Sequence, residues 1–465
     1  MNLIVWGTGN LYKRYRDILF KFNIIKFCDN DLEKQGTILD GIEIISPLAL
    51  KQIDFTYVIV MSYALEAICQ QLDDLGVAKD QIILHTQLCV LRQPEISVRS
   101  MGYEVSLDEW IEKNQNCILL ISHNFSYTGI PVAVKNMAQV LKKMGYSVLI
   151  AAMEGGPFTK ELEQLKMEYI DDLELCYQSL YFKEMLQAFI AVVIGSFSLS
   201  NLVRTLVDFD IPILWWVHET SNKYFIGENE VPVGRNIRFF AGGNRVKEIF
   251  SSHYKNVIIE TLQYCIPDSH DNVDCIESDY MTIAVIGTID KRKAQDILLE
   301  AITRMPRELR VKLKVIFVGQ LDENDIIFAD KIRVLQNQID NFEWIPEMTQ
   351  EKLNRFIQCI DVLVCPSRDD PMPIVVTQAM MHEKVCVMSE NVGQAEFIKQ
   401  AVNGFVFPNE DSKTLMVILV WMLENKNRHS MIGKASREIY KSEFSENIME
   451  QRLSLIINEL LRQGK

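Results

Sequence analysis

The sequence predicts an α/β protein built from three units with parallel sheets. Short apolar runs typical of buried strands alternate with segments of helical periodicity, and this alternation favours parallel strands joined by crossover helices. The pattern begins anew near residues 2, 117 and 282. A chain of 465 residues with 48% apolar and 24% charged residues has the size and composition of an ordered multidomain protein.

The net charge of −14 argues against some classes of partner. There are 62 Asp and Glu against 48 Lys and Arg, and a protein binds nucleic acid phosphates mainly through Lys and Arg. We therefore expect no nucleic-acid partner.

Cysteine usage and hydropathy indicate the compartment. Ten cysteines are scattered without paired or zinc-like spacing, which is typical of reduced thiols rather than of a disulfide framework. Neither a signal peptide nor an apolar run of membrane-spanning length is visible. We expect a cytoplasmic protein, and contact with the inner face of the membrane stays an open alternative.

Residues 1–95 predict a small Rossmann-like accessory domain. Its expected strands are residues 2–6, 24–28, 57–61 and 81–84, and its expected helices are residues 11–22 and 64–75. Gly7 and Gly9 follow the first strand and Asp29 ends the second, as in a dinucleotide-binding fingerprint. Tyr12 stands where that fingerprint has its third glycine. The turn is thus either a structural turn that binds nothing or a site for a nucleotide or another small ligand.

Two larger units follow, each after an expected linker. Residues 91–112 and 265–280 predict linkers because they are rich in polar, Gly or Pro residues. The expected domains are residues 112–270 and 276–445, closed by an amphipathic helix over residues 446–465. The expected strands are 117–122, 146–152, 191–194, 213–217, 282–286, 314–318, 362–365 and 385–389, and the expected helices are 131–144, 295–304 and 375–381.

Two loops that follow strands have features of anion sites. Gly129 and Pro131 open a helix, whose N-terminus favours an anion such as a diphosphate. The run 287–296 places Lys291, Arg292 and Lys293 at the carboxyl end of a strand, where open parallel sheets bind ligands. The alternatives are an ordinary loop at Gly129 and a solvated basic turn at residues 291–293.

The run 365–381 is the most informative part of the sequence. A buried strand ends in a loop with two prolines, and the loop leads into a helix. Asp370 and Gln378 lie eight residues apart, so one can accept hydrogen bonds from sugar hydroxyls while the other bonds a ribose. Asp369 and Asp370 together would also suit a metal, but no further ligands gather nearby in the sequence.

These motifs resemble retaining GT-B glycosyltransferases of glycosyltransferase family 4. The family pattern P-S-x-x-E-(G)-x-P-x4-E-A-M is matched in spacing from Pro366 to Met380, with Asp370 and Gln378 in place of the two glutamates. Lys293 matches the lysine of the family's G-R-x4-K-G element, whose arginine is absent here. The resemblance covers residues 115–465 and implies two Rossmann-like domains facing a cleft, the last helix returning to the first of them. Residues 1–90 resemble small modules appended to other sugar-modifying enzymes.

The resemblance also implies the site. Asp370, His218 and Lys293 would be catalytic, and His123 and Asn124 would meet the acceptor. The implied donor-binding residues are Gly129, Gly287, Thr288, Arg292, Lys293, Trp344, Ile345, Met372, Pro373, Ile374, Thr377 and Gln378. Trp344 and Ile345 would flank the base, Gln378 would hold the ribose, and Lys293 would neutralise the diphosphate.

The implied activity is transfer of a hexose or N-acetylhexosamine with retention from a nucleotide sugar, a UDP-sugar by expectation, to a glycan, lipid-linked or protein-linked acceptor. Neither a metal nor another cofactor is expected. One alternative is a catalytically weak subunit that binds a partner transferase, because Gln378 is neutral and Asp370 is one methylene shorter than Glu. Another is a GT-B phosphorylase or epimerase. The apolar stretch 177–189 is either a buried helix or a peripheral membrane contact, and the oligomeric state stays open.

Overall fold

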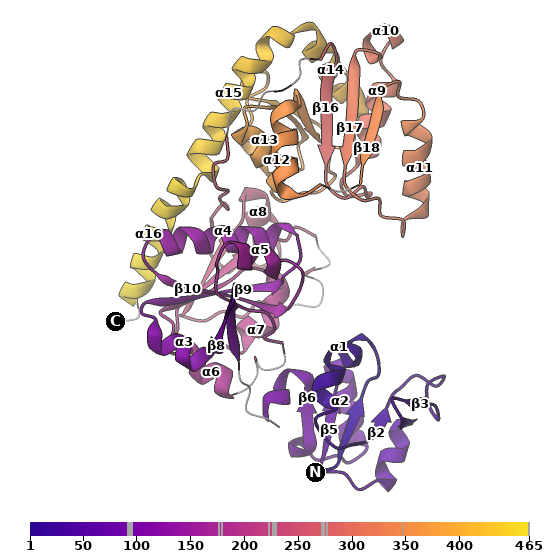
Figure 1. Cartoon of the computed structure of the whole chain (residues 1–465), viewed down its shortest axis with the longest axis vertical. Coiled ribbons are helices and arrows are strands. Elements are labelled where there is room, and N and C mark those ends of the chain that lie inside the picture. Colours follow the sequence, from indigo (N-terminus) through magenta and orange to yellow (C-terminus); the bar gives the residue numbers. More distant parts are fainter. Residues whose placement is uncertain are drawn as a thin grey trace. The chain divides into compact units, whose positions relative to one another are not determined.

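The computed structural model describes residues 1–90, 96–174, 177, 180–221, 224–225, 230–270, 275, 278–346 and 348–463. Their contacts form two compact units. The first comprises residues 1–113, 152–155 and 170–188, and the second comprises residues 114–151, 156–169 and 189–465. The elements of both are labelled in Figure 1.

The first unit contains the predicted small α/β domain. Its sheet has the order β3-β4-β2-β1-β5-β6, parallel except for the β3–β4 pair. The strands are β1 (Leu3–Trp6), β2 (Ile24–Cys28), β3 (Ile38–Leu39), β4 (Ile42–Ile45), β5 (Tyr57–Val60) and β6 (Ile82–Leu84), and the helices are α1 (Asn10–Leu19) and α2 (Leu65–Asp74). The β3–β4 hairpin escaped sequence analysis because its strands are very short.

The glycine turn after β1 is used structurally. Gly7 has φ +107°, and a Cβ there would lie 2.5 Å from the carbonyl oxygen of Met61. The Asp29 carboxylate accepts hydrogen bonds from the Thr8 amide at 3.0 Å and from the Thr8 hydroxyl. Burial works against the charge of Asp29, but these hydrogen bonds and that of the Asp31 amide hold its pKa below the usual value. The carboxylate therefore stabilises its own turn, in agreement with the structural interpretation.

Most of the first expected linker is regular structure. The strands β7 (Ser97–Ser100) and β8 (Tyr103–Ser106) form an antiparallel hairpin, and α3 (Leu107–Lys113) follows it directly. The expectation of a linker over 91–112 is therefore wrong for these residues, while 91–95 lie outside the described ones. In the second expected linker, 271–274 and 276–277 also lie outside them.

The apolar stretch 177–189 forms α6 (Leu180–Leu186). Phe182, Met185, Leu186 and Phe189 are all buried, as the buried-helix interpretation requires. The side chain of Leu180 is outside the described residues. Within the described ranges, no helix combines the length and apolar character needed to cross a bilayer.

The second unit begins with a sheet of the order β15-β14-β13-β12-β9-β10-β11. Its strands are β9 (Cys117–Asn124), β10 (Ser147–Glu154), β11 (Tyr169–Ile170), β12 (Ala191–Ile194), β13 (Ile213–Val217), β14 (Ile237–Ala241) and β15 (Ile259–Thr261). The helices around it are α4 (Gly129–Lys143), α5 (Thr159–Gln164), α7 (Ser200–Arg204) and α8 (Asn244–His253). Continuous burial of β12 and β13 explains their appearance as unbroken apolar runs.

The last sheet is parallel throughout, with the order β18-β17-β16-β19-β20-β21. The strands are β16 (Met281–Ile286), β17 (Leu313–Val318), β18 (Phe342–Ile345), β19 (Val362–Cys365), β20 (Val385–Ser389) and β21 (Phe405–Phe407). The chain proceeds outward from β16 to β18 and then returns to β19 beside β16. The crevice at the carboxyl ends of β16 and β19 is therefore a topological switch point, where such sheets bind ligands.

Helices cover both faces of this sheet (Figure 1). The helices of this domain are α9 (Gln295–Thr303), α10 (Arg307–Arg310), α11 (Ile326–Gln336), α12 (Gln350–Cys359), α13 (Ile374–Met381), α14 (Ser412–Glu424) and α15 (His429–Ile439), and α16 (Glu446–Gln463) follows them in the chain. One core cluster joins the strands to α9, α11 and α14. The last helix, α16, packs on α4, where Lys143 Nζ lies 2.7 Å from Glu446.

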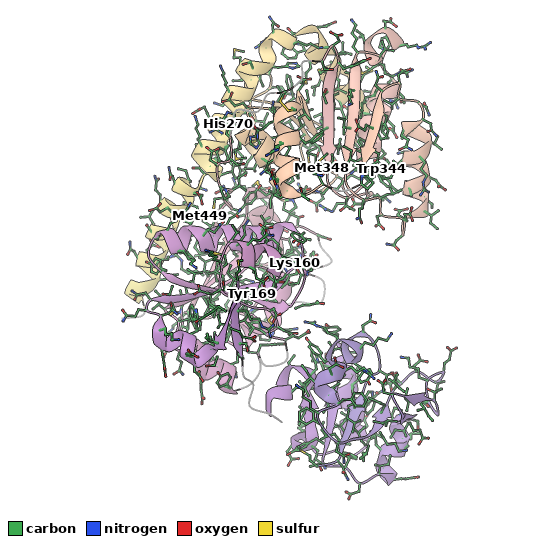
Figure 2. All side chains as sticks on the ribbon, viewed as in Figure 1. Lys160, Tyr169, His270, Trp344, Met348 and Met449 are labelled. Carbon is green, nitrogen blue, oxygen red and sulfur yellow. A yellow bond between two sulfur atoms is a disulfide. The ribbon has the colours of Figure 1, made fainter. Side chains whose placement is uncertain are left out.

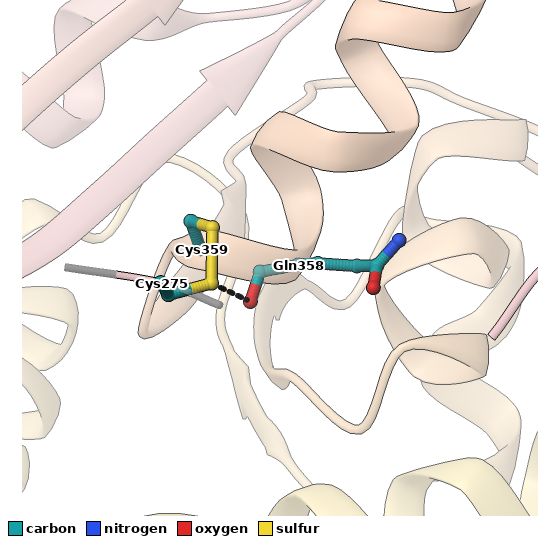
Figure 3. The surroundings of a disulfide bond; sticks show 3 residues. All are labelled: Cys275, Gln358 and Cys359. Atoms are coloured by element: carbon teal, nitrogen blue, oxygen red, sulfur yellow. Dashed lines mark hydrogen bonds between the residues drawn. A yellow bond between two sulfur atoms is a disulfide. The ribbon is translucent and has the colours of Figure 1, made fainter. Parts of the chain in front are cut away.

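One disulfide corrects the expectation of reduced thiols. Cys275 and Cys359, separated by 84 residues, are bonded to each other, with a Cα–Cα distance of 5.3 Å. Figure 3 shows the bond at the end of α12, where Cys275 Sγ lies 3.4 Å from the Gln358 carbonyl oxygen. Among the described residues, six cysteines remain free. A pair so distant in sequence carries no spacing signal.

The contact of α15 with the turn after α13 generates a stability prediction. A Cβ on Gly433 would lie 1.8 Å from the carbonyl oxygen of Glu383. Gly433→Ala should therefore force the backbones apart and lower the free energy of unfolding by about 1–3 kcal/mol. Thermal unfolding of the full chain measures the effect. Gly129→Ala is the control, because a Cβ there meets nothing within 4 Å. Equal melting temperatures for both variants would contradict the prediction.

Candidate functional site

Two loops meet at the switch point of the last sheet. The loop after β16 carries Lys293, whose Nζ lies 2.5 Å from Asp370 Oδ2 on the loop after β19. Arg292 Nη1 lies 3.5 Å from the same oxygen. Asp370 is only 5% exposed. The predicted catalytic residues Lys293 and Asp370 are thus direct neighbours, with Arg292 beside them.

The two loops are also joined through their backbones. The Arg368 amide donates to the Arg292 carbonyl at 2.8 Å, and the Arg292 guanidinium donates to the Asp369 carbonyl at 3.1 Å. Arg368 further binds the buried carboxylate of Asp296 at 2.9 Å. Burial opposes the charge of Asp296, but Arg368 and Lys331 hold its pKa below the usual value. The cation-bearing loop is therefore fixed before any ligand arrives.

Gly287 lies beside the side chain of Lys293. Its φ of +133° is a conformation that other residues rarely adopt, and a Cβ there would be in ordinary contact with Lys293 Cε at 3.5 Å. The neighbouring Thr288 offers its carbonyl to Gln295 at 2.9 Å. Both predicted donor-binding residues thus lie at the carboxyl end of β16, beside the cations.

The first turn of α13 lies on the same loop as Asp370. Pro373 is its N-cap residue and no side chain caps the helix. Met372 is buried, while Ile374 is partly exposed. Uncapped amides at a helix N-terminus favour an anion, so this turn and Lys293 can act on one ligand.

Thr377 is a correction to the predicted site. Its side chain is completely buried, and its hydroxyl lies 2.7 Å from the Tyr264 hydroxyl and 3.0 Å from Gln394 Nε2. Because these partners are themselves buried, Thr377 secures α13 in the core instead of contacting a donor. Gln378 lies on a different side of the helix, where its Nε2 donates to Asn354 Oδ1 at 3.2 Å.

Trp344 and Ile345 end β18, on the same sheet edge as the two loops. The Trp344 indole donates to the Gly319 carbonyl at 2.8 Å, and the Ile345 carbonyl accepts from the Gly319 amide at 2.9 Å. The Trp344 side chain is partly buried and packs against the core of this domain. Figure 2 labels the residue. Its N–H is engaged, so only the ring surface is left for a base.

His218 lies at the end of β13. Gly242 makes room for its ring, because a Cβ there would lie 2.6 Å from His218 Nδ1. His218 Nε2 is buried and has no hydrogen-bond partner in the described part of the chain. Removal of the ring from water, together with the neighbouring His123, lowers the pKa of His218 to about 3. The ring is therefore neutral at physiological pH and can still accept or donate one hydrogen bond.

The other predicted residues of this sheet lie at its strand ends. His123 and Asn124 end β9, and Gly129 opens α4. Asn124 Oδ1 accepts from the Ser126 amide and hydroxyl, which shapes the loop before α4. A Cβ on Gly129 would point into open space, so a ligand can approach this helix end.

Two further acids escaped sequence analysis. Glu219 is buried and accepts hydrogen bonds from the Phe197 amide, the Ser196 hydroxyl and the His218 amide. Asp369 accepts from Thr220 and Arg245. Apart from the adjacent His218, their partners are 22 to 149 residues away. Only the adjacency of Glu219 to His218 could have drawn attention to either acid.

Comparison with known families agrees with this geometry. Residues 114–260 match the family described as Glycosyl-transferase family 4, and residues 270–439 match Glycosyl transferases group 1. The two matches coincide with the two Rossmann-like domains of a GT-B fold. Residues 1–83 match a third family, C2185-like, N-terminal.

Curated relatives of these GT-B domains are distant. Granule-bound starch synthase 1 of Pisum sativum is 28% identical over 131 residues, which are 28% of this chain and 21% of the relative. Glycogen synthase of Thermodesulfovibrio yellowstonii is 26% identical over 165 residues, 35% of this chain and 32% of the relative. The chain thus spans no more than about a third of the length of these two relatives.

Solved structures show the same fold. HepE of Anabaena in complex with UDP and glucose aligns with a TM-score of 0.63 and 14% identity, over 74% of this chain and 100% of HepE. A glycosyltransferase of Rickettsia africae aligns with a TM-score of 0.63 and 15% identity, over 75% of this chain and 99% of its own. These likenesses establish the α/β GT-B fold.

The lowered pKa of His218 generates a pH prediction. Between about pH 6.5, the usual value for histidine, and pH 3, the unfolded chain binds a proton at this ring that the folded chain does not bind. Stability contributed by the neutral ring is therefore complete above pH 6.5 and decreases as the pH falls. The melting temperature of His218→Asn, taken relative to wild type at the same pH, should therefore be higher at pH 5 than at pH 7.5. Melting curves of both proteins measure this, and a difference that is constant with pH would contradict it.

Proposed function

We propose that the chain is a retaining glycosyltransferase that moves a hexose or N-acetylhexosamine from a UDP-sugar to a glycan, lipid-linked or protein-linked acceptor. The observation that carries the proposal is the pairing of Lys293 with Asp370 at the switch point, beside Arg292 and the uncapped first turn of α13. This arrangement offers positive charge and backbone amides to a diphosphate. It also offers a carboxylate to the hydroxyls of the attached sugar.

The two ends of the donor have separate partners in this proposal. The half-buried ring surface of Trp344, with Ile345, is available to a base, and Gln378 to the ribose. HepE, which has the same fold, was crystallised with UDP and glucose, and this supports uridine as the base. Gln378 contributes neutral hydrogen bonds only, which are about half as strong as those of a carboxylate.

The chemistry follows from where charge develops. When the bond between the anomeric carbon and the diphosphate breaks, negative charge grows on the leaving phosphate and positive charge on the sugar. The negative charge on the phosphate is stabilised by Lys293, Arg292 and the α13 amides. The positive charge on the sugar develops next to Asp370. The acceptor hydroxyl attacks from the face that the diphosphate leaves, and its proton passes to the leaving phosphate oxygen. Fixed charges of this kind commonly supply the largest catalytic contribution.

His218 serves as a positioning contact in this scheme. Its Nε2 has no partner in the described part of the chain, and its low pKa keeps it neutral. A neutral ring can bind a donor sugar hydroxyl without repelling the positive charge that develops on the sugar. His123 and Asn124, at the end of β9, are proposed to meet the acceptor.

A catalytically weak, partner-binding subunit is the second candidate. The observations that favour it are the neutral Gln378 and the short Asp370. The direct contact of Lys293 with Asp370 favours the enzyme, because a scaffold does not need a cation–carboxylate pair at the switch point.

Donor turnover tests the proposal. UDP-, GDP- and ADP-sugars are screened by thermal shift, and any product is identified by mass spectrometry. Lys293→Met should lower kcat/KM for the accepted donor by about 10²–10³-fold, since it removes a charge that acts on the leaving group. Asp370→Asn should lower kcat more than it raises the donor KM.

Lys314→Met is the matched control, because Lys314 forms an exposed ion pair with Glu343 on the same sheet and should leave turnover unchanged. If no nucleotide sugar binds or reacts, and Lys293→Met changes nothing, the enzyme proposal fails and the partner-binding candidate stands.

A further inference from the structure

Asp369 and Asp370 are adjacent in sequence but their carboxylates have different partners. Asp370 pairs with Lys293 of its own domain. Asp369 accepts from the Thr220 hydroxyl at 2.7 Å and from Arg245 Nη2 and Nε at 2.9 and 3.1 Å. Thr220 follows β13 and Arg245 lies in the first turn of α8, so both partners belong to the other Rossmann-like domain.

Arg245 binds the side chains of two residues next to the Asp370 backbone, Asp369 and Asn391. Its Nη1 donates to Asn391 Oδ1 at 3.2 Å, while its other nitrogens bind Asp369. The Asn391 carbonyl accepts the Asp370 amide at 3.2 Å, and Asn391 Nδ2 donates to the Arg368 carbonyl at 2.8 Å. A single guanidinium therefore contacts Asn391, which accepts the Asp370 amide, and Asp369, the residue that precedes Asp370.

The same contact surface includes His218. Thr220 is two residues from His218, and Gly242 and Gly243 lie between His218 and the loop after β19. A Cβ on Gly243 would lie 2.5 Å from Met372 Cε. The side chains of Arg245 and Asp369 are 28% and 29% exposed, so the ion pair is accessible enough to separate when the domains move.

We propose that Asp369, with Arg245 and Thr220, is a closure latch that couples the approach of the two domains to the placement of Asp370 and His218. Asp369 is a positioning residue in this scheme and touches no substrate. The inference rests on the proposed function for its kinetic consequence, but the latch itself is a property of the unliganded chain.

Hydrogen exchange of the full unliganded chain tests the latch directly. Asp369→Asn and Arg245→Met should each speed exchange of amides in residues 366–374 and 390–394 by about two- to fivefold, the range expected for an accessible ion pair. Amides of β16 should not change. The effects of the two substitutions in the double variant should be less than additive, because both remove the ion pair between Arg245 and Asp369. Asp369→Glu should restore protection in part.

Kinetics test the coupling to Asp370. With the donor found active in the screen, Asp369→Asn should lower kcat by about two- to fivefold. It should leave the donor dissociation constant within about twofold, because the proposed donor contacts other than His218 lie on the domain of Lys293 and Asp370. Arg310→Met is the matched control, since Arg310 and Asp340 form an ion pair of similar exposure within a single domain.

The outcomes separate the two proposals. If no donor reacts but exchange rises as expected, the proposed function fails and the latch stands. If exchange of both loops is unchanged in both single variants, or if the effects of the two substitutions simply add, the latch is wrong whatever the donor results.

Discussion

The contact between Lys293 and Asp370 is the interaction on which the site depends. A carboxylate that is 5% exposed is unfavourable unless it is paired, so the loops after β16 and β19 must stay in register. The backbone bond from Arg368 to Arg292 and the side-chain bond from Arg292 to the Asp369 carbonyl maintain that register. The lysine that neutralises Asp370 is thereby placed where an incoming diphosphate would meet it. Arg292 is half-exposed beside Lys293. It supplies a second positive charge, so that the Asp370 carboxylate and an incoming diphosphate would each have a cation.

The sequence predicted the strands that build this site because each is buried on both faces. Residues 191–194, 213–217, 362–365 and 385–389 coincide with β12, β13, β19 and β20, which are buried along their whole length. The hairpins β3–β4 and β7–β8 were not predicted, since two- to four-residue strands that are partly exposed have no such pattern. Long-range chemistry was missed for a different reason. Neither the Cys275–Cys359 bond nor the partners of Asp369 and Glu219 can be inferred from local spacing.

Thr377 shows where motif spacing stops being informative. Ile374 and Gln378 are four residues apart and so share one face of α13, whereas Thr377 points elsewhere. The motif places all three near a donor, but a helix of eight residues at a domain junction must also bury one side. Tyr264 and Gln394 occupy that side, and Gln394 also binds the Pro373 carbonyl at 2.9 Å. Thr377, which the sequence assigned to the donor, therefore holds α13 in place through its buried hydrogen bonds. The first turn of that helix is the one proposed to meet the donor.

Mostly parallel α/β sheets recur along this chain, but their strand ends carry different chemistry. The first domain has a glycine turn and an acid at the second strand end, yet Asp29 is used by Thr8 and Asp31, and Tyr12 fills the place of a third glycine. In the last sheet the corresponding strand end carries Arg292 and Lys293 instead. The same topology thus yields a self-satisfied turn in one domain and a cationic crevice in another, because strand ends position side chains without dictating which ones they are.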